Sequence, residues 1–302
     1  MDKPKFIMLV GLPCSGKSTK GQELAKEYNA TVFSSDALRE ELFGDVNEQS
    51  RDQELFTELH KRIKDCLREG KSAIYDACNR NYKKRMAFLA ELKNIPCEKI
   101  CVIMATPYEE CIKRSRIRER KVPEYVIKRM YFNFHMPYWY EGWDDIRIEY
   151  AENSVGYYGS MSDFIRDYEN YDQHNSHHEL TLGEHCKQTN LNAQSLAVGR
   201  ATCLAAAIHD CGKPEVAAFK DSKGNDSEEC HYYNHQYVGC YKALFFNAHG
   251  FASVLDVAIR VMWHMQPYFN KEEKTKEKYR KLWGEDLYND IMKLHEADRA
   301  AH

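Results

Sequence analysis

The residues Gly11-Leu-Pro-Cys-Ser-Gly-Lys-Ser18 place the strongest constraint on how this chain can fold. They match the pattern G-x-x-x-x-G-K-[ST], directly after the apolar run at residues 6–10 and before a helical stretch. Glycines let backbone N–H groups curl around phosphate oxygens, and the N-terminus of the following helix adds its positive end. This context predicts a phosphate-binding loop that holds a nucleoside triphosphate, in preference to a simple glycine-rich turn.

Two polar side chains of this loop have predicted tasks. Lys17 would hold the β- and γ-phosphates, and the hydroxyl of Ser18 would bind a Mg²⁺ ion. The predicted cofactor is therefore ATP or another nucleoside triphosphate together with Mg²⁺. The predicted nucleotide contacts are Gly11, Pro13, Cys14, Ser15, Gly16, Lys17, Ser18 and Thr19.

The first half of the chain alternates apolar runs with amphipathic stretches, which is the pattern of a parallel α/β sheet. The clearest helix is predicted at residues 52–68, where apolar residues recur on one face and Gly70 ends the helix. Pro123 opens another helix after a basic stretch. The predicted strands are residues 6–10, 31–35, 72–77, 99–105 and 146–150.

The pattern changes after about residue 160. Long helical stretches replace the β-branched runs, and eleven of the thirteen histidines lie in this second part. We therefore predict an α/β P-loop kinase domain at residues 1–153 and an all-α domain at residues 154–302. The length of 302 residues also favours two domains over one.

The composition excludes several classes of protein. Apolar residues make up 43% of the chain and charged residues 29%, as in globular proteins and unlike disordered chains. The longest apolar runs are strand-sized, so no membrane span is expected, and the first residues lack a signal-peptide cleavage site. Eleven cysteines without C-x-x-C spacing are typical of reduced thiols, so we expect a cytoplasmic protein with no membrane partner.

The two halves differ in charge. Residues 1–150 hold 27 Lys and Arg against 24 Asp and Glu, whereas the remainder holds 16 against 22. The chain therefore lacks a globally basic surface for nucleic acid. Basic charge is concentrated at residues 113–121, KRSRIRERK, which carry six basic residues and one Glu. A solvated helix face is the alternative interpretation of that stretch.

Polar residues after the second and third predicted strands indicate a phosphate-acceptor site, because ligands bind at the carboxyl edge of a parallel sheet. Asp36 and Arg39 lie three residues apart on a first helical turn and share a face. Asp36 can accept a hydroxyl proton while Arg39 grips a neighbouring phosphate. A helix N-cap with an incidental arginine is the alternative. Asp76-Ala-Cys-Asn79 brings another carboxylate to the same edge.

These motifs resemble a known family. GLPCSGKS, DALR, DACN and RSRIR followed by VP, in this order, are similar to the 5′-hydroxyl polynucleotide kinases of nucleic-acid repair across residues 5–150. The resemblance implies that Asp36 is the general base and that Arg39 clamps the phosphate on the 3′ side of the acceptor nucleotide. It also implies that Asp76 and Asn79 lie near the acceptor.

The basic stretch falls where nucleotide kinases carry a lid. Arg114 and Arg118 are four residues apart and could close on the transferring phosphoryl group, and the resemblance makes them the lid arginines, which bind the nucleotide. The spacing from the lid to Val-Pro is one residue off the phage pattern. The chain also lacks the D-x-D-G-T signature of the phosphatase half of many such enzymes, so any phosphatase here must be built differently.

The second half carries histidines and carboxylates in a metal-binding order. His209 and Asp210 are adjacent at the end of an apolar helix. Imidazole and carboxylate ligands suit Mn, Fe, Co, Ni or Zn. One histidine in a helix is more often packed or on the surface, but six such residues favour a site for one or two divalent ions. The predicted ligands are His185, His209, Asp210, His235, His264 and Asp298.

The order H…HD…H…H…D resembles the HD-superfamily phosphohydrolases across about residues 173–302. By this resemblance the core ligands are His185, His209, Asp210 and Asp298, and a second metal site is completed by His235 and His264. Lys213, close after the HD pair, and His178, before the first ligand, are predicted phosphate contacts. A helix-end cation is the alternative for Lys213.

The two halves together predict a bifunctional end-healing enzyme. One domain would phosphorylate 5′-hydroxyl ends of RNA or DNA, and the other would remove 3′-phosphate and 2′,3′-cyclic phosphate ends, with Asp210 in the hydrolytic site. A ligase acting downstream is the expected partner. A small-molecule kinase fused to an HD nucleotidase is the main alternative, supported by the mild net acidity. The second alternative function is a nucleotide-sensing module whose HD half is regulatory.

Overall fold

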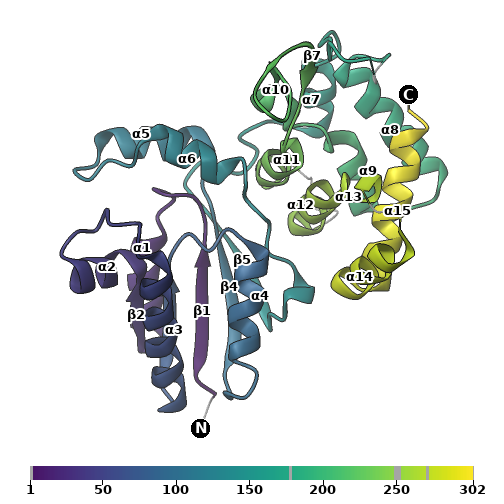
Figure 1. Ribbon diagram of the computed structural model, residues 1–302. Helices are drawn as coiled ribbons and strands as arrows, with labels where there is room; N and C mark the ends of the chain where they lie inside the picture. The colour runs from purple at the N-terminus through teal and green to yellow at the C-terminus, as the bar shows by residue number, and fades with distance from the viewer. Residues whose placement is uncertain (1–2, 177–178, 248–252, 270–271, 302) are drawn as a thin grey trace. The chain divides into compact units, whose positions relative to one another are not determined.

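The computed structural model describes residues 3–176, 179–247, 253–269 and 272–301, and the chain forms two compact units (Figure 1). The amino-terminal unit comprises Met1–Ile127 and Pro137–Ala151, and the carboxy-terminal unit comprises Lys128–Met136 and Glu152–His302. The sequence had assigned residues 128–136 to the first domain. Aromatic packing explains their place in the second, because the rings of Tyr131 and Phe134 lie edge-on to Tyr241 at centroid distances of 5.6 and 4.8 Å.

The amino-terminal unit is built on a five-stranded parallel sheet, which confirms the predicted α/β fold. The strand order is β2-β3-β1-β4-β5. In this register Leu9 lies between Asp76 and Val102, so the residues that follow β1 emerge beside the end of β3. The strands are β1 (Lys5–Val10), β2 (Ala30–Ser34), β3 (Ser72–Asp76), β4 (Glu98–Ala105) and β5 (Asp145–Tyr150).

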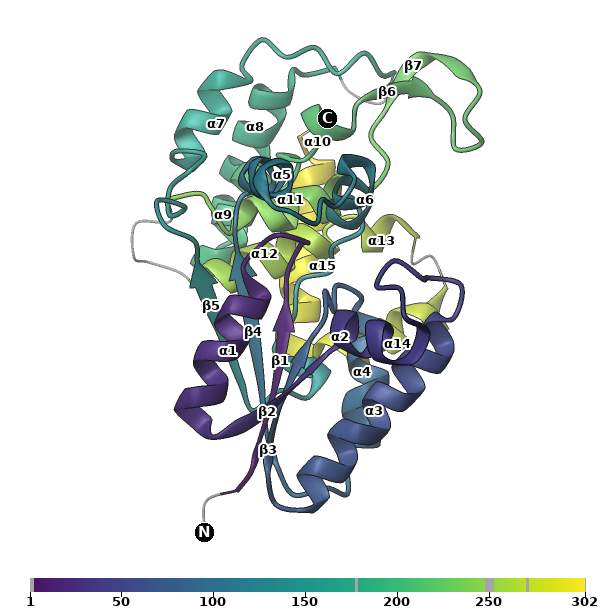
Figure 2. The same cartoon turned by 90° about the vertical axis from the view of Figure 1, so that its left-hand side faces the viewer.

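Helices cover both faces of this sheet. Right-handed crossovers place α1 on one face and α3 and α4 on the other (Figure 2). Strands covered on both faces are buried throughout, which is why β1 and β4 read as continuous apolar runs. The elements are α1 (Lys17–Tyr28), α2 (Ser35–Phe43), α3 (Asp52–Arg68), α4 (Tyr82–Glu91), α5 (Tyr108–Ile117), α6 (Glu124–Tyr131) and the 3₁₀ helix η1 (Trp139–Glu141).

The carboxy-terminal unit is mainly helical. α8 packs on α9 and α15, and α12 packs on α9 and α11. The core of this unit contains completely buried apolar side chains, among them Val238, Val261 and Leu294. The helices are α7 (Met161–Asp167), α8 (Leu182–Ser195), α9 (Arg200–Ile208), α10 (Lys213–Val216), α11 (His235–Ala243), α12 (Val254–Trp263), α13 (Gln266–Phe269), α14 (Glu273–Trp283) and α15 (Glu285–Arg299).

The prediction that this second half is entirely helical is wrong at one place. β6 (Ala218–Lys220) and β7 (Asp226–His231) form an antiparallel hairpin. The turn between them is closed by Asp221, whose carboxylate accepts hydrogen bonds from the backbone N–H groups of Lys223 and Asn225. This local turn chemistry favours a hairpin over a helix.

Among the described residues, no helix is both long enough and apolar enough to cross a membrane.

Candidate functional site

The phosphate-binding loop connects β1 to α1 in the amino-terminal unit. Gly16 adopts φ 95° and Cys14 adopts φ 64°, so the backbone curls tightly before the helix begins. The ammonium of Lys17 lies within this curl, where Nζ donates to the carbonyl oxygens of Gly11 at 3.2 Å and Leu12 at 2.6 Å. The cation is therefore placed where the loop would receive phosphate oxygens.

Residues from the neighbouring strand ends hold this loop in place. The N–H of Gly11 donates to the carbonyl of Cys78 at 3.2 Å, and Nδ2 of Asn79 donates to the carbonyl of Leu9 at 2.9 Å. On the other side, Oγ1 of Thr106 donates to the carbonyl of Ser15 at 2.9 Å. The sequence predicted Asn79 as a substrate contact, and in the structure its amide anchors the strand that leads into the loop.

Asp76 lies at the end of β3 beside the first turn of α1. Burial raises the pKa of its carboxyl group. A hydrogen bond with the Ser18 hydroxyl and the nearby Lys17 ammonium oppose this rise. Asp36 lies near enough to add to the rise. Asp76 therefore stands between the residue predicted to bind Mg²⁺ and the residue predicted to act as base.

Asp36 and Arg39 lie together at the start of α2. The N-cap of this helix is Ser34, whose Oγ accepts a hydrogen bond from the N–H of Ala37, so Asp36 is not the capping residue. Nη1 of Arg39 is 3.5 Å from Asp36 Oδ1, and Nη2 is 2.6 Å from Asp52 Oδ1. Arg39 is 6% exposed. Among the described residues, none accepts a hydrogen bond from its Nε.

The two predicted lid arginines face the phosphate-binding loop. Nη1 of Arg118 donates to Sγ of Cys14 at 3.5 Å. Nη1 of Arg114 lies 3.9 Å from where a Cβ atom on Gly16 would be, and its Nε donates to Glu110 at 2.9 Å. Both guanidinium groups are therefore on the nucleotide side of the site.

A third arginine of the basic stretch, which the sequence analysis missed, reaches the acceptor side. Nη1 of Arg120 donates to Asp36 Oδ2 at 2.7 Å. Helix α5 ends at Ile117, and Arg118 has extended backbone angles, so the helical spacing that singles out Arg114 and Arg118 does not extend to Arg120. Only its membership of the basic stretch could have marked it.

The predicted metal ligands converge in the carboxy-terminal unit, and all six side chains are buried. His209 caps the end of α9, His264 caps the end of α12, and Asp210 follows His209 after the helix has ended. The helix ends at this point, so the adjacent His209 and Asp210 can face one centre. His185 comes from α8, His235 begins α11 and Asp298 lies in the last turn of α15.

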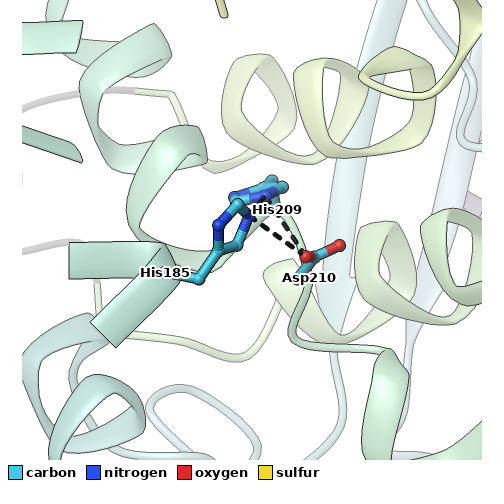
Figure 3. Close-up of side chains that lie close together, drawn as sticks. All are labelled: His185, His209 and Asp210. Carbon is cyan, nitrogen blue, oxygen red and sulfur yellow. Dashed lines mark hydrogen bonds and ion pairs between the residues drawn. The ribbon is translucent and has the colours of Figure 1, made fainter. Parts of the chain in front are cut away.

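Asp210 is the common member of two groups of ligands. Its Oδ2 lies 3.6 Å from Nε2 of His185 and 3.3 Å from Nε2 of His209 (Figure 3). Asp298 Oδ1 completes this group at 3.1 Å from His185 and 3.4 Å from His209. The other oxygen of Asp210, Oδ1, lies 3.1 Å from Nε2 of His235 and 3.5 Å from Nε2 of His264.

The histidine rings are oriented from behind by backbone carbonyls. Nδ1 of His209, His235 and His264 lies 2.9, 2.7 and 2.7 Å from the carbonyl oxygen three residues earlier. A carbonyl only accepts, so Nδ1 carries the proton and, in the neutral ring, Nε2 presents a lone pair to the centre. His235 and His264 thus direct two lone pairs at each other across 3.1 Å, beside a carboxylate. This donor set fits a divalent cation.

Charge in the cluster is set by its buried ion pairs. Burial opposes the charged form of Asp210. The Lys213 ammonium, whose Nζ lies 2.7 Å from Oδ2, outweighs this effect of burial together with His209. The two groups hold the pKa of Asp210 well below its ordinary value. Burial lowers the pKa of His264 to about 4, so this ring is neutral at pH 7. The carboxylate of Asp210 and the ring of His264 are thus in the states that bind metal. At His209, burial is outweighed by the carboxylate of Asp210, which raises the pKa of the ring well above its ordinary value, so a metal ion bound at this ring would displace a proton.

The structure describes one of the two residues of this unit that were predicted to contact phosphate, Lys213. Lys213 is buried and bonds Asp210 and Oε1 of Gln173, the latter at 2.6 Å. Its ammonium therefore supports the ligand cluster directly. His178 lies outside the described residues.

Gly212, within the HD-x-G-K motif, is the residue that lets this cluster close. A Cβ atom at this position would lie 2.1 Å from the carbonyl oxygen of His235 and 2.6 Å from the N atom of Gly239. Only a glycine permits the segment after the HD pair to approach α11 so closely. This approach brings Asp210 next to His235.

Comparison with known proteins adds a family for the first half. Residues 6–137 match the AAA domain family. The L-seryl-tRNA(Sec) kinase of Methanococcus maripaludis is 28% identical over 154 residues, which cover 49% of this chain and 60% of the relative. The chain thus spans less than two thirds of the length of that relative.

Similar solved structures include several kinases. A putative kinase from Chloroflexus aurantiacus is 19% identical, with 50% of this chain and 86% of that chain covered and a TM-score of 0.42. A chain of the Pnkp1/Rnl/Hen1 RNA repair complex is 24% identical, with 43% of each chain covered and a TM-score of 0.38. The parallel sheet, the phosphate-binding loop and the family match over residues 6–137 give the amino-terminal unit the fold of a P-loop kinase domain.

Proposed function

We propose that the chain heals nucleic-acid ends with two separate sites, a 5′-hydroxyl polynucleotide kinase and a metal-dependent 3′-phosphatase. The observation that carries this proposal is the meeting of four histidines and two aspartates in the same chain as a phosphate-binding loop. A 5′-hydroxyl end and a 3′-phosphate or 2′,3′-cyclic phosphate end are the two products of RNA cleavage through the 2′-hydroxyl. A ligase needs the opposite pair of ends.

In the kinase site, Lys17 and Ser18 would hold the triphosphate and its Mg²⁺ ion, and Asp36 would act on the acceptor. The 5′-hydroxyl oxygen bonds to the γ-phosphorus while the bond to the β,γ-bridging oxygen breaks and the nucleoside diphosphate leaves. The hydroxyl proton passes to the carboxylate of Asp36. Arg114 and Arg118 face the loop and would neutralise charge on the transferring phosphoryl group.

In the second site, the two groups of ligands that share Asp210 would hold one or two divalent ions. Such ions act as Lewis acids, which polarise a phosphate ester and make water a stronger nucleophile near neutral pH. Water supplies the oxygen that bonds to phosphorus, and the bond from phosphorus to the 3′ oxygen breaks. A proton from the water passes to the 3′ oxygen, so the products are a 3′-hydroxyl end and inorganic phosphate. Lys213 would keep Asp210 charged and oriented.

The curated relative supports a nucleic-acid acceptor. It is by name a kinase of L-seryl-tRNA(Sec), a substrate that contains RNA. The acceptor side of this chain offers two arginines around Asp36, which suits an acceptor that carries phosphate next to its hydroxyl.

One oligonucleotide with a 5′-hydroxyl and a 3′-phosphate tests both activities. The protein is incubated with ATP and Mg²⁺, with and without Mn²⁺, Ni²⁺, Co²⁺ or Zn²⁺, and each end is analysed by mass spectrometry. We expect a phosphate gained at the 5′ end and lost at the 3′ end, the second only with a transition metal. Phosphorylation of free nucleosides or sugars, with the oligonucleotide unchanged, would instead establish the small-molecule alternative.

A further inference from the structure

Arg120 joins the lid segment to the acceptor side of the kinase site. Its Nη1 donates to Asp36 Oδ2 at 2.7 Å, and its Nη2 donates to the carbonyl of Val46 at 3.4 Å. The residue follows α5 in a segment without helical structure. It therefore links the lid both to α2 and to the loop that follows α2.

Asp36 lies between two guanidinium groups that come from different parts of the chain. Arg39 faces Oδ1 at 3.5 Å and Arg120 faces Oδ2 at 2.7 Å. The side chain of Arg39 is 7% exposed and also paired with Asp52, whereas that of Arg120 is 37% exposed and has a neutral carbonyl as its second partner. Arg120 is thus the partner that can leave Asp36 at the smaller energetic cost.

An acceptor hydroxyl must reach an oxygen of Asp36 before its proton can be transferred. Oδ1 lies beside the buried side chain of Arg39 and Oδ2 is bonded by the more exposed Arg120. Access to Oδ2 therefore requires that binding of the acceptor gives Arg120 another anion. A phosphate next to the hydroxyl supplies that anion, and its oxygens can accept from both guanidinium groups at once. A nucleoside without phosphate offers no such exchange.

We infer that Arg120 is a specificity-determining residue, which binds, together with Arg39, the phosphate adjoining the acceptor hydroxyl. This inference rests on the proposed kinase function. The arginines of the basic stretch then have two different roles. Arg114 and Arg118 face the phosphate-binding loop, whereas Arg120 faces the acceptor side.

The test compares two acceptors in the full-length protein, a nucleoside 3′-monophosphate and the same nucleoside without phosphate. Arg120→Ala and Arg120→Lys are measured beside Arg116→Ala, a matched control because Arg116 lies in the same basic stretch, is largely exposed and pairs with Glu124. We expect Arg120→Ala to raise KM for the phosphorylated acceptor about tenfold or more, the usual effect of losing a hydrogen bond to a charged group. KM for ATP should stay unchanged, because Arg114 and Arg118 lie on the nucleotide side. The plain nucleoside should not react more slowly, because the substitution removes a partner that competes for Asp36. Arg120→Lys should fall between the wild type and Arg120→Ala.

Binding of the nucleoside 3′-monophosphate by titration calorimetry gives a second readout that needs no turnover. We expect weaker binding by Arg120→Ala and ordinary binding by Arg116→Ala, with unchanged melting temperatures. A rise in KM for ATP alone would assign Arg120 to the donor. Faster phosphorylation of both acceptors by Arg120→Ala would make the contact with Asp36 merely inhibitory. If the wild-type protein phosphorylates neither acceptor, the proposed function fails, whereas phosphorylation that is indifferent to Arg120 overturns this inference alone.

Discussion

The hydroxyl of Tyr268 donates a 2.8 Å hydrogen bond to Oδ2 of Asp298, while Oδ1 of the same carboxylate lies 3.1 Å from His185 Nε2. Tyr268 also lies edge-on to the ring of His295 at a centroid distance of 4.3 Å, which holds it in place. One oxygen of the Asp298 carboxylate thus faces the ligand cluster, and the other accepts a hydrogen bond from the half-buried Tyr268. Tyr268 acts as a positioning residue for the proposed metal site.

Tyr268→Phe should weaken metal binding without unfolding the protein. Loss of a hydrogen bond that orients a ligand typically costs about 10–100-fold in metal affinity. The affinity is measured by chelator competition with Mn²⁺ or Zn²⁺. Tyr233→Phe is the control, because Tyr233 is exposed and stacks on His231, which is not one of the six ligands. Equal affinities for all three proteins would exclude the positioning role.

Asp210→Asn should remove all bound transition metal, because both groups of ligands depend on this carboxylate. His264→Ala should retain about half of the metal if two ions bind, since the group around His185 keeps its ligands. Metal analysis of the purified proteins distinguishes these outcomes. Asp210→Asn should also lower the melting temperature, because the buried ammonium of Lys213 loses its carboxylate. An unchanged metal content would refute the shared-ligand arrangement.

Asp36→Asn should abolish 5′ phosphorylation and leave 3′-phosphate removal intact. General-base catalysis contributes about 10²–10⁴-fold to a rate, so a loss of this size is expected in kcat. KM for ATP should remain near the wild-type value, because Lys17 and the loop stay in place. Asp210→Asn should show the reverse pattern in the same assays. Loss of both activities from either substitution would contradict the independence of the two sites.

The buried ion pair of Arg85 and Glu141 should be important for the stability of the kinase domain. Arg85 Nε donates to Glu141 Oε2 at 2.7 Å, and its Nη1 donates to the carbonyl of Asn79 at 2.9 Å. Glu141→Gln leaves the guanidinium charge buried without a counter-charge, so we expect a loss of about 3–5 kcal/mol in the free energy of unfolding. Urea denaturation measures it.

The double variant Arg85→Met, Glu141→Gln serves as the control for that experiment. It removes the unpaired charge, so it should be more stable than Glu141→Gln alone. It should still bind ATP more weakly than the wild type, because Asn79, which anchors the strand before the phosphate-binding loop, loses a hydrogen bond from Arg85. A double variant no more stable than the single one would show that the charge pair is not the source of the effect.

The local patterns of the sequence predicted the framework of the kinase domain well. Helix α3 begins and ends at the predicted residues, because its apolar stripe and Gly70 are contiguous signals. Strands β1 and β4 were equally accessible, since burial on both faces makes each of them a nearly continuous apolar run. The hairpin of β6 and β7 was missed, because its strands are short and mostly polar and depend on the turn at Asp221.

By itself, the sequence determined the phosphate-binding loop, the parallel sheet and the identity of the residues that could bind metal. Each of these depends on residue type and on spacing along a few turns or one strand. Only the tertiary structure decided that Arg120 reaches Asp36 and that Asp76 hydrogen bonds with Ser18. It also decided that the two oxygens of the Asp210 carboxylate face two different pairs of histidines. These contacts join residues from separate elements, and their distances depend on how helices and strands pack, which no local pattern encodes.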